Sequence, residues 1–267
     1  MSHPLLTVDA FTNRAFAGNP AGVCLLDRPA APEWMQRVAA EMNLSETAFL
    51  VPGDEAFALR WFTPTTEVAL CGHATLASAH ALWDTGRVPR RARIAFDTAS
   101  GRLHGELDGD QIVIELPWLP VVRCEAPAAL TAAFRATPES CHTTRPLAGG
   151  EGNYLLVFAE EGTIRELSPD WQALAAVPAG VIVTAPGADP HDFVSRYFAV
   201  PYGIDEDPVT GSAHCSLAPY WAGRLGRTRM RAYQASSRGG ELTVTLAGDR
   251  VRLGGHAVTV LRGEILV

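Results

Sequence analysis

The chain has 267 residues, of which 47% are hydrophobic, and a formal net charge of −7, which suits two globular domains of about 130 residues each. All 22 basic residues are arginines, so enzymes that need a lysine amine, such as pyridoxal phosphate enzymes and P-loop proteins, are excluded. The acidic balance argues against a nucleic-acid surface, which needs clustered positive charge.

The first segment, MSHPLLTVDAF, has neither a basic region nor a long apolar region and is interpreted as a strand, not a signal peptide. No run approaches the ~18 apolar residues of a membrane span. The five cysteines are scattered without a CxxC pair, which is typical of a reduced, cytoplasmic protein without a disulfide framework. We therefore expect no membrane and no nucleic acid among its partners.

In chain order, alternating apolar residues predict strands in the first half at 5–11, 21–26, 46–51, 57–62, 93–97, 102–107 and 111–116. Helices are predicted at 31–43, starting at Pro32, and at 73–86, ending at Gly86. The second half predicts strands at 153–159, 179–185, 193–199, 229–234, 241–246, 250–255 and 257–267. Its helices are predicted at 168–177 and 212–223, the latter kinked or shortened by Pro219.

The chain repeats itself at an offset of 139 residues. Gly72 falls on Gly211, and residues 100–113 fall on residues 239–252. Upstream of these, the RWF of 60–62 matches the RYF of 196–198. The repeat predicts two similar domains, 1–118 and 119–256, each with strands around one small-residue helix. We expect the last strand, about 257–267, to return to the first domain.

Each of these two central helices begins with glycine and a small or polar residue, in CGHAT and TGSAH. The first N–H groups of a helix lack partners within the helix and carry positive partial charge. Glycine lets a ligand approach that backbone, so Gly72 and Gly211 are candidates to hold an anionic group such as a carboxylate. Ordinary helix starts are the alternative explanation.

The two copies differ at ionisable positions, where chemistry rather than fold would explain the difference. His73 matches Ser212, and Asp207 matches Val68. Asp207 could instead cap the helix that follows it. Glu46 begins an otherwise apolar strand and matches a position near Ile182, so partial burial is expected to raise its carboxyl pKa and suit it to proton transfer. A solvated strand edge or a partner of a helix N-cap is the alternative for Glu46.

Four stretches together resemble the PhzF-like family of phenazine-biosynthesis isomerases: VDAFTNRAFAGNPAGV, EMNLSETAFL, FTPTTEVALCGHATLASAHAL and GIDEDPVTGSAHCSL. The resemblance covers the whole chain. It implies an α+β fold of the diaminopimelate-epimerase-like type. In that fold two pseudo-symmetric domains each wrap a curved, mostly antiparallel sheet around a central helix, and the active site lies in the cleft between them.

The resemblance also implies roles for individual residues. The catalytic residues it implies are Glu46, His73 and Asp207, with Glu46 as the acid/base. The substrate-binding residues it implies are Gly72, Gly211, Ser212 and Asn19. The family reaction moves a proton between carbons of a dihydro-hydroxyanthranilate, a small anionic substrate of phenazine biosynthesis. It uses no organic cofactor and no metal, and the family suggests a homodimer.

Related epimerases use one cysteine at each of the two helix starts. Here Cys71 is matched by Thr210, so a two-thiol mechanism cannot operate. The leading interpretation is a cofactor-independent isomerase acting on a small carboxylate. The alternatives are an amino-acid epimerase or racemase that pairs Cys71 with Asp207 or Glu46, and a non-catalytic protein that binds small carboxylates.

Overall fold

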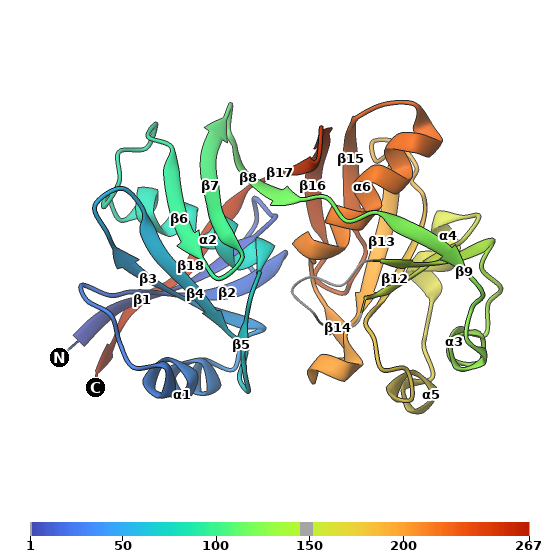
Figure 1. Ribbon diagram of the computed structural model, residues 1–267, viewed down its shortest axis with the longest axis horizontal. Coiled ribbons are helices and arrows are strands. Elements are labelled where there is room, and N and C mark those ends of the chain that lie inside the picture. Colours follow the sequence, from blue (N-terminus) through green and yellow to red (C-terminus); the bar gives the residue numbers. More distant parts are fainter. Residues whose placement is uncertain (1, 145–151, 267) are drawn as a thin grey trace. The chain divides into compact units, whose positions relative to one another are not determined.

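The structure, a computed structural model, describes residues 2–144 and 152–266 (Figure 1). It divides into two compact units, one running to Leu116 and resuming at Arg252, the other spanning Pro117–Val251. The sequence repeat puts the same two divisions after residues 118 and 256. Among the described residues, no helix has the length and apolar character needed to cross a membrane.

The first unit is built on a mixed, mostly antiparallel sheet. Its strands are β1 (Ser2–Ala10), β2 (Asn19–Leu25), β3 (Glu46–Pro52), β4 (Phe57–Phe62), β5 (Glu67–Val68), β6 (Ile94–Thr98), β7 (Gly101–Asp108), β8 (Gln111–Pro117) and β18 (Ala257–Leu266). Strand β1 pairs with β18 and β2, and pairing continues through β3, β4, β6 and β7 to β8. The β2–β3 and β4–β6 pairs are parallel.

Helix α2 (Gly72–Asp84) is the central helix of this unit (Figure 1). It contacts β1, β2, β3, β7 and β18, and all of its residues except His80 and Asp84 are buried. Since the contacted strands include β18 at one end of the pairing order and β7 near the other, the sheet curves around the helix. Small residues permit this approach, because a Cβ on Gly105 of β7 would lie only 3.0 Å from the Cβ of Ala79.

Helix α1 (Pro32–Met42) packs on the other face of the same sheet. It buries Met35, Val38 and Ala39 in a cluster that includes Phe49 and Phe62. Proline in its first turn and Asn43 in the left-handed conformation after its last residue mark its two ends. The sheet of the first unit therefore has α1 on one face and α2 on the other, and alternate residues of each strand face one helix or the other.

The second unit contains β9 (Val121–Cys124), β10 (Ser140–Thr144), β11 (Tyr154–Val157), β12 (Val181–Pro186), β13 (Phe193–Phe198), β14 (Glu206–Asp207), β15 (Arg229–Gln234), β16 (Gly240–Ala247) and most of β17 (Arg250–Gly255). Its helices are α3 (Ala128–Phe134), α4 (Glu161–Glu166), α5 (Trp171–Ala175), η1 (Val200–Tyr202) and α6 (Gly211–Leu225). Strands β5, β9, β10 and β14 and helices α3, α4 and η1 have no counterpart among the predicted elements.

The order of strand pairing is the same in the two units. In the first, β2–β3 is parallel, β3–β4 antiparallel and β4–β6 parallel, with α2 between β5 and β6. In the second, β11–β12 is parallel, β12–β13 antiparallel and β13–β15 parallel, with α6 between β14 and β15. The sequence repeat is thus a repeat of topology.

The repeated RWF and RYF triplets have a structural role. Arg60 forms a two-pronged ion pair with Glu67, and its guanidinium lies 5.1 Å from the ring centre of Phe62. Arg196 does the same with Glu206 and Phe198, at 5.0 Å. Both pairs link the short strand before the central helix to its neighbour, so these identities preserve the fold rather than a site.

The sequence predicts a kink or a shortening at Pro219. Helix α6 runs through Pro219 to Leu225, so the shortening does not occur. A proline inside a helix removes the N–H that would bond to the carbonyl four residues earlier, here that of Cys215. Leu119 supplies the missing donor, since its N–H bonds to the Cys215 carbonyl at 2.9 Å. The carbonyl is therefore satisfied, and the helix continues.

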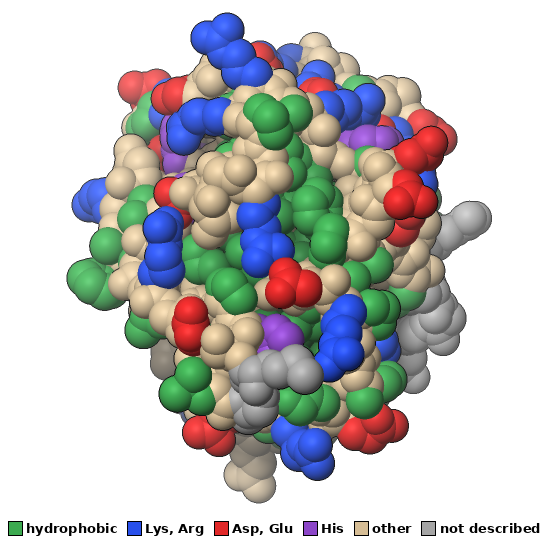
Figure 2. All heavy atoms as spheres, turned by 90° about the vertical axis from the view of Figure 1, so that its left-hand side faces the viewer, with side chains coloured by type: hydrophobic (Ala, Val, Ile, Leu, Met, Phe, Trp, Pro, Cys, Tyr) green, Lys and Arg blue, Asp and Glu red, His purple; other side chains and the backbone are tan. Residues whose placement is uncertain are grey.

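The surface carries charges of both signs. Figure 2 shows acidic and basic side chains interspersed, with hydrophobic side chains between them, over the face that it presents. That face offers no large area of uniform positive charge of the kind that binds a phosphate backbone.

Candidate active site

Glu46 is the first residue of β3 and points toward the start of α2. Alternation along the strand puts it on the same face as Ala48 and opposite Phe49, which packs with α1. In the parallel pair β2–β3 it lies beside Ala21. Its side chain is 19% exposed, so the carboxylate is shielded from water but still accessible.

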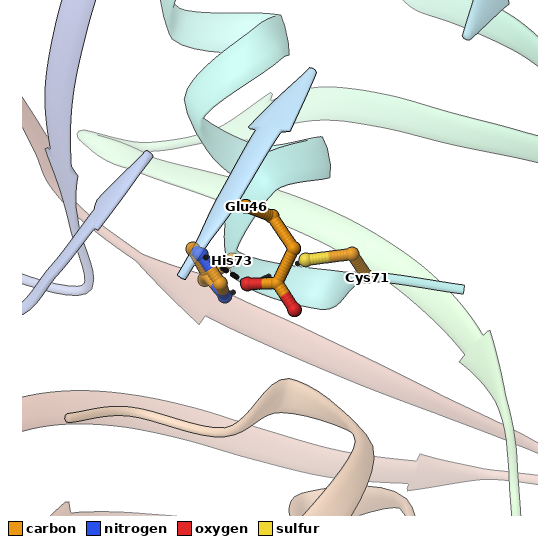
Figure 3. A group of neighbouring side chains, drawn as sticks. All are labelled: Glu46, Cys71 and His73. Atoms are coloured by element: carbon orange, nitrogen blue, oxygen red, sulfur yellow. Dashed lines mark hydrogen bonds and ion pairs between the residues drawn. The ribbon is translucent and has the colours of Figure 1, made fainter. Parts of the chain in front are cut away.

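His73 faces this carboxylate from the first turn of α2. Its Nε2 lies 3.3 Å from Glu46 Oε2 (Figure 3). Burial lowers the pKa of His73 to about 3, so the imidazole is neutral near pH 7. A neutral ring carries one proton, and the position of that proton is decided by the partner of the other nitrogen.

Asn19, the first residue of β2, is that partner. Its Nδ2 lies 3.2 Å from His73 Nδ1, while its Oδ1 accepts a hydrogen bond from Ser45 Oγ at 3.4 Å. Because the amide nitrogen can only donate, His73 Nδ1 accepts and the ring proton sits on Nε2, which faces Glu46. Asn19 therefore fixes the tautomer of His73.

Cys71 completes this group as the residue preceding α2. Its Sγ lies 3.5 Å from His73 Nδ1, and Figure 3 shows it converging on the same space as Glu46. Glu46, Cys71 and His73 each offer one ligand atom, all within 4.8 Å of one another. These are atom types that zinc binds, and three protein ligands are the number found in catalytic zinc sites. No fourth acidic, histidine or cysteine ligand joins them among the described residues.

A second polar group surrounds Asp207 in the other unit. Thr210 Oγ1 donates to Asp207 Oδ2 at 2.5 Å. Gln234, which is fully buried at the end of β15, accepts from the Thr210 N–H at 2.8 Å and donates to the Asp207 carbonyl at 2.8 Å and to Thr210 Oγ1 at 3.1 Å. Since Thr210 Oγ1 already accepts from Gln234, its own proton goes to the Asp207 carboxylate.

The starts of the two central helices are alike. Cys71 and Thr210 precede α2 and α6 with extended backbone, and neither side chain caps its helix. The N–H groups of the first turn, near Gly72 and Gly211, are therefore not used by those side chains. Ser212 occupies in α6 the place that His73 has in α2. Both helix starts retain the features that make Gly72, Gly211 and Ser212 candidates for binding an anion.

The strand register shows what replaces Glu46 in the second unit. Thr47 pairs with Phe62, and Val181 pairs with the equivalent Phe198. Glu46 therefore corresponds to Gly180, two residues before the position near Ile182 suggested by the sequence. A Cβ on Gly180 would collide with Tyr197 Oη and would lie 2.6 Å from Asn153 Oδ1.

The structure thus brings together four of the residues singled out in the sequence, Glu46, Cys71, His73 and Asn19, and adds Ser45 to them. In the second unit it places Asp207 with Thr210 and Gln234. Sequence reasoning noticed Thr210 only as the mismatch to Cys71. The hint of Gln234 was slight, a polar residue closing the apolar alternation of RMRAYQ.

Known proteins are similar to this chain over its full length. A family model described as phenazine biosynthesis-like protein matches residues 8–263. A protein from Halalkalibacterium halodurans named as an uncharacterized isomerase is 46% identical over 270 residues, covering 100% of both chains. A crystal structure of a PhzF family phenazine biosynthesis protein from Enterococcus faecalis matches with a TM-score of 0.93 and 40% identity, again over 100% of both chains.

A more distant likeness bears on the fold alone. The structure of a probable proline racemase from Agrobacterium radiobacter matches with a TM-score of 0.69 at 14% identity, covering 99% of this chain and 93% of that one. The predicted fold class, α+β with the diaminopimelate-epimerase-like arrangement, is confirmed by these neighbours.

Proposed function

Since this chain belongs to the PhzF-like family of phenazine biosynthesis-like proteins, whose named relatives include isomerases, we propose that it is a cofactor-independent isomerase. It moves a proton from one carbon of a small carboxylate substrate to another. The substrate is a cyclic, unsaturated acid that resembles a dihydro-hydroxyanthranilate, in which both carbons belong to one conjugated system.

The observation that carries this proposal is the pair formed by Glu46 and His73. A carboxylate with a side chain that is 19% exposed faces a buried, neutral imidazole at 3.3 Å. A general base must be ionised and within reach of the proton, and partial shielding from water raises its basicity. A neutral imidazole that carries its proton on Nε2 has no free lone pair facing Glu46. It can therefore lie beside the carboxyl group without accepting the proton that Glu46 takes from the substrate.

Glu46 accepts the proton from the first carbon, and the electron pair that it leaves behind moves into the conjugated system of the substrate. The same carboxylic acid then returns the proton to the second carbon. His73 Nε2 lies beside the carboxylate of Glu46, at 3.3 Å from Oε2, and Asn19 holds His73 in its tautomer. Such acid/base assistance contributes typically 10²–10⁴-fold to a rate.

The remaining assignments concern binding of the substrate. The N–H groups at each helix start are candidates for binding an anionic group: those near Gly72 in the first unit, and those near Gly211 and Ser212 in the second. Helix dipoles and backbone donors without a partner inside the helix favour negative charge there. Asp207, held by Thr210 and Gln234, accepts a hydrogen bond from a polar group of the substrate as charge shifts in the transition state. The enzyme acts in the cytoplasm as a homodimer, in phenazine biosynthesis or a related biosynthetic process.

A second candidate is an epimerase or racemase in which Cys71 acts with a non-thiol partner. The 3.5 Å contact between Cys71 Sγ and His73 Nδ1 favours it. Thr210, the residue equivalent to Cys71, argues against it. Its hydroxyl donates to Asp207, and a hydroxyl in that role does not replace the second cysteine that exchanges a proton with carbon in the related epimerases. A non-catalytic carboxylate-binding protein is the third candidate.

Exchange with heavy water separates these functions. The protein is incubated in deuterium oxide with a dihydro-hydroxyanthranilate and, separately, with L-proline, and deuterium at carbon is followed by NMR. An isomerase gives a shifted double bond with deuterium at the accepting carbon of the cyclic acid. Exchange at the α-carbon of proline with loss of chirality would favour the epimerase, and binding without any exchange would favour the non-catalytic protein.

A further inference from the structure

Two cysteines of the second unit lie directly opposite each other on neighbouring strands. Cys124 of β9 and Cys141 of β10 are register partners in an antiparallel pair. Their Sγ atoms are 3.5 Å apart, and both cysteines are free. No role in the proposed isomerase uses either of them.

The backbone at this pair already suits a disulfide. Disulfides span Cα–Cα distances of about 4.4–6.8 Å. Directly opposite residues of an antiparallel pair lie about 4.5 or 5.5 Å apart, and both values fall in that range. The sulfurs need only approach from 3.5 Å to a bond of about 2.05 Å, which side-chain rotation can supply without moving the strands.

The surroundings of the two thiols differ. Cys124 is half-buried, whereas Cys141 is 4% exposed. Burial, followed by the neighbouring Cys124 thiol, raises the pKa of Cys141 to about 12. An oxidant from solution therefore reaches Cys124 first, and Cys141 is positioned behind it to attack the oxidised sulfur.

We propose that Cys124 and Cys141 are an oxidative modification site that closes into a disulfide when the protein meets a peroxide. The Cys124 thiol gives up its proton, and the thiolate attacks the peroxide. The O–O bond breaks, a sulfenic acid forms, and the departing hydroxide takes up that proton and leaves as water. Cys141 then attacks the Cys124 sulfur, the S–O bond breaks, and the departing hydroxide takes the Cys141 proton as a second water. Two thiols are oxidised and one peroxide is reduced.

The sequence makes this bond simple to detect. Without lysine, trypsin cuts only after arginine, and Arg123 and Arg135 flank Cys124 so that it leaves in the peptide 124–135. Cys141 leaves in a separate peptide that begins at residue 136. After treatment of the folded protein with hydrogen peroxide and blocking of remaining thiols, we expect the two peptides to appear linked, two hydrogen atoms lighter than their sum. Dithiothreitol should separate them.

Thiol titration gives an independent count. The protein carries five free cysteines, and the denatured, oxidised protein should show three. The buried Cys24 and Cys215 serve as internal controls, because burial raises the pKa of each thiol to about 12. The oxidised form should also unfold at a Tm a few °C higher, since the bond constrains the unfolded chain.

Matched variants identify the pair. In Cys124→Ser the thiol of Cys141 should survive peroxide, and the linked peptide should be absent. In Cys141→Ser the Cys124 peptide should instead gain oxygen, because no thiol remains to resolve its sulfenic acid. The proposal is overturned if wild-type protein keeps five thiols, if Cys124 is over-oxidised with Cys141 still present, or if Cys124 links to a second copy of the chain. None of these readouts depends on the isomerase activity.

Discussion

Glu46 of the first unit and Gly180 of the second occupy the same position in the two copies of the fold. The space that the carboxylate side chain takes in one unit is filled in the other by Tyr197 and Asn153, whose side chains hydrogen-bond at 3.0 Å. The two units therefore share a topology and not a site. The two units differ here in two ways: one has an ionisable residue where the other has glycine, and the side chains packed around that position differ as well.

Packing at Gly180 can be tested by substitution. Gly180→Ala should lower the free energy of unfolding by about 1–3 kcal/mol, as overpacking does, because its Cβ would meet Tyr197 Oη and Asn153 Oδ1. Adding Tyr197→Phe should recover part of the loss. Gly223→Ala is the matched control, since no atom lies within 4 Å of its Cβ position in α6, and it should be neutral or stabilising. Equal urea midpoints for both alanine variants would show that the collision is relieved without cost.

Gln234 should support the segment that carries Asp207. Gln234→Met removes the acceptor of the Thr210 N–H and the donor to the Asp207 carbonyl. Each buried group left without a partner costs about 1–3 kcal/mol, so unfolding by urea should show a loss of at least roughly 2 kcal/mol. Gln36→Met removes one bond, from Nε2 to the Thr63 carbonyl, and should cost less than about 1.5 kcal/mol. Similar losses for the two variants would argue against a special role for Gln234.

Stability should fall as the solution is acidified below pH 6.5. Burial lowers the pKa of His73 to about 3 and that of His214 to about 4. The folded protein therefore binds fewer protons than the unfolded chain between these values and the ordinary pKa of 6.5. Each group then lowers the free energy of unfolding by up to about 1.4 kcal/mol per pH unit in that window.

The variant His214→Thr isolates one of these groups. His214 Nδ1 contacts the Thr210 carbonyl at 2.8 Å, and the equivalent Thr75 of the first unit donates to the Cys71 carbonyl. Threonine can therefore keep the bond without binding a proton. The free energy of unfolding is measured with urea at several pH values between 7.5 and 4.5. Its dependence on pH should be weaker in the variant by close to one bound proton, whatever the change in absolute stability. An unchanged pH dependence would mean that His214 takes up its proton as readily in the folded protein as in the unfolded chain.

The sequence predicts the repeat and the central helices because small residues and apolar alternation are local features. It also points to Glu46, since a carboxylate at the head of an apolar strand stands out. It could not identify Gly180 as the counterpart of Glu46 or bring Cys124 next to Cys141, because both depend on strand register. The sequence could not predict that α6 continues past Pro219 either. The N–H group that replaces the missing donor belongs to Leu119, which lies far away in the chain.

Cys71 should not be essential for turnover. The matched position is Thr210, so the start of the second central helix carries no thiol, and the proposed proton carrier is Glu46. Cys71→Ser should keep at least about a tenth of the wild-type turnover, as expected when no general acid/base is lost. The contact with His73 Nδ1 at 3.5 Å is weak enough for a serine hydroxyl to replace it. A folded Cys71→Ser protein without activity would move the epimerase mechanism to first place.

Glu46→Gln is the decisive substitution for the proposed mechanism. Glutamine has nearly the same shape, so β3 and the surroundings of His73 should be preserved, but an amide cannot take a proton from carbon and return it. Turnover should fall by at least about 100-fold, while binding of the carboxylate substrate survives because the helix-start N–H groups are unchanged. The matched control is Glu67→Gln, which weakens an ion pair between half-exposed side chains and should leave turnover intact. Both variants are assayed with a dihydro-hydroxyanthranilate in deuterium oxide. If Glu46→Gln incorporates deuterium at the wild-type rate, Glu46 is not the acid/base, and another group must carry the proton.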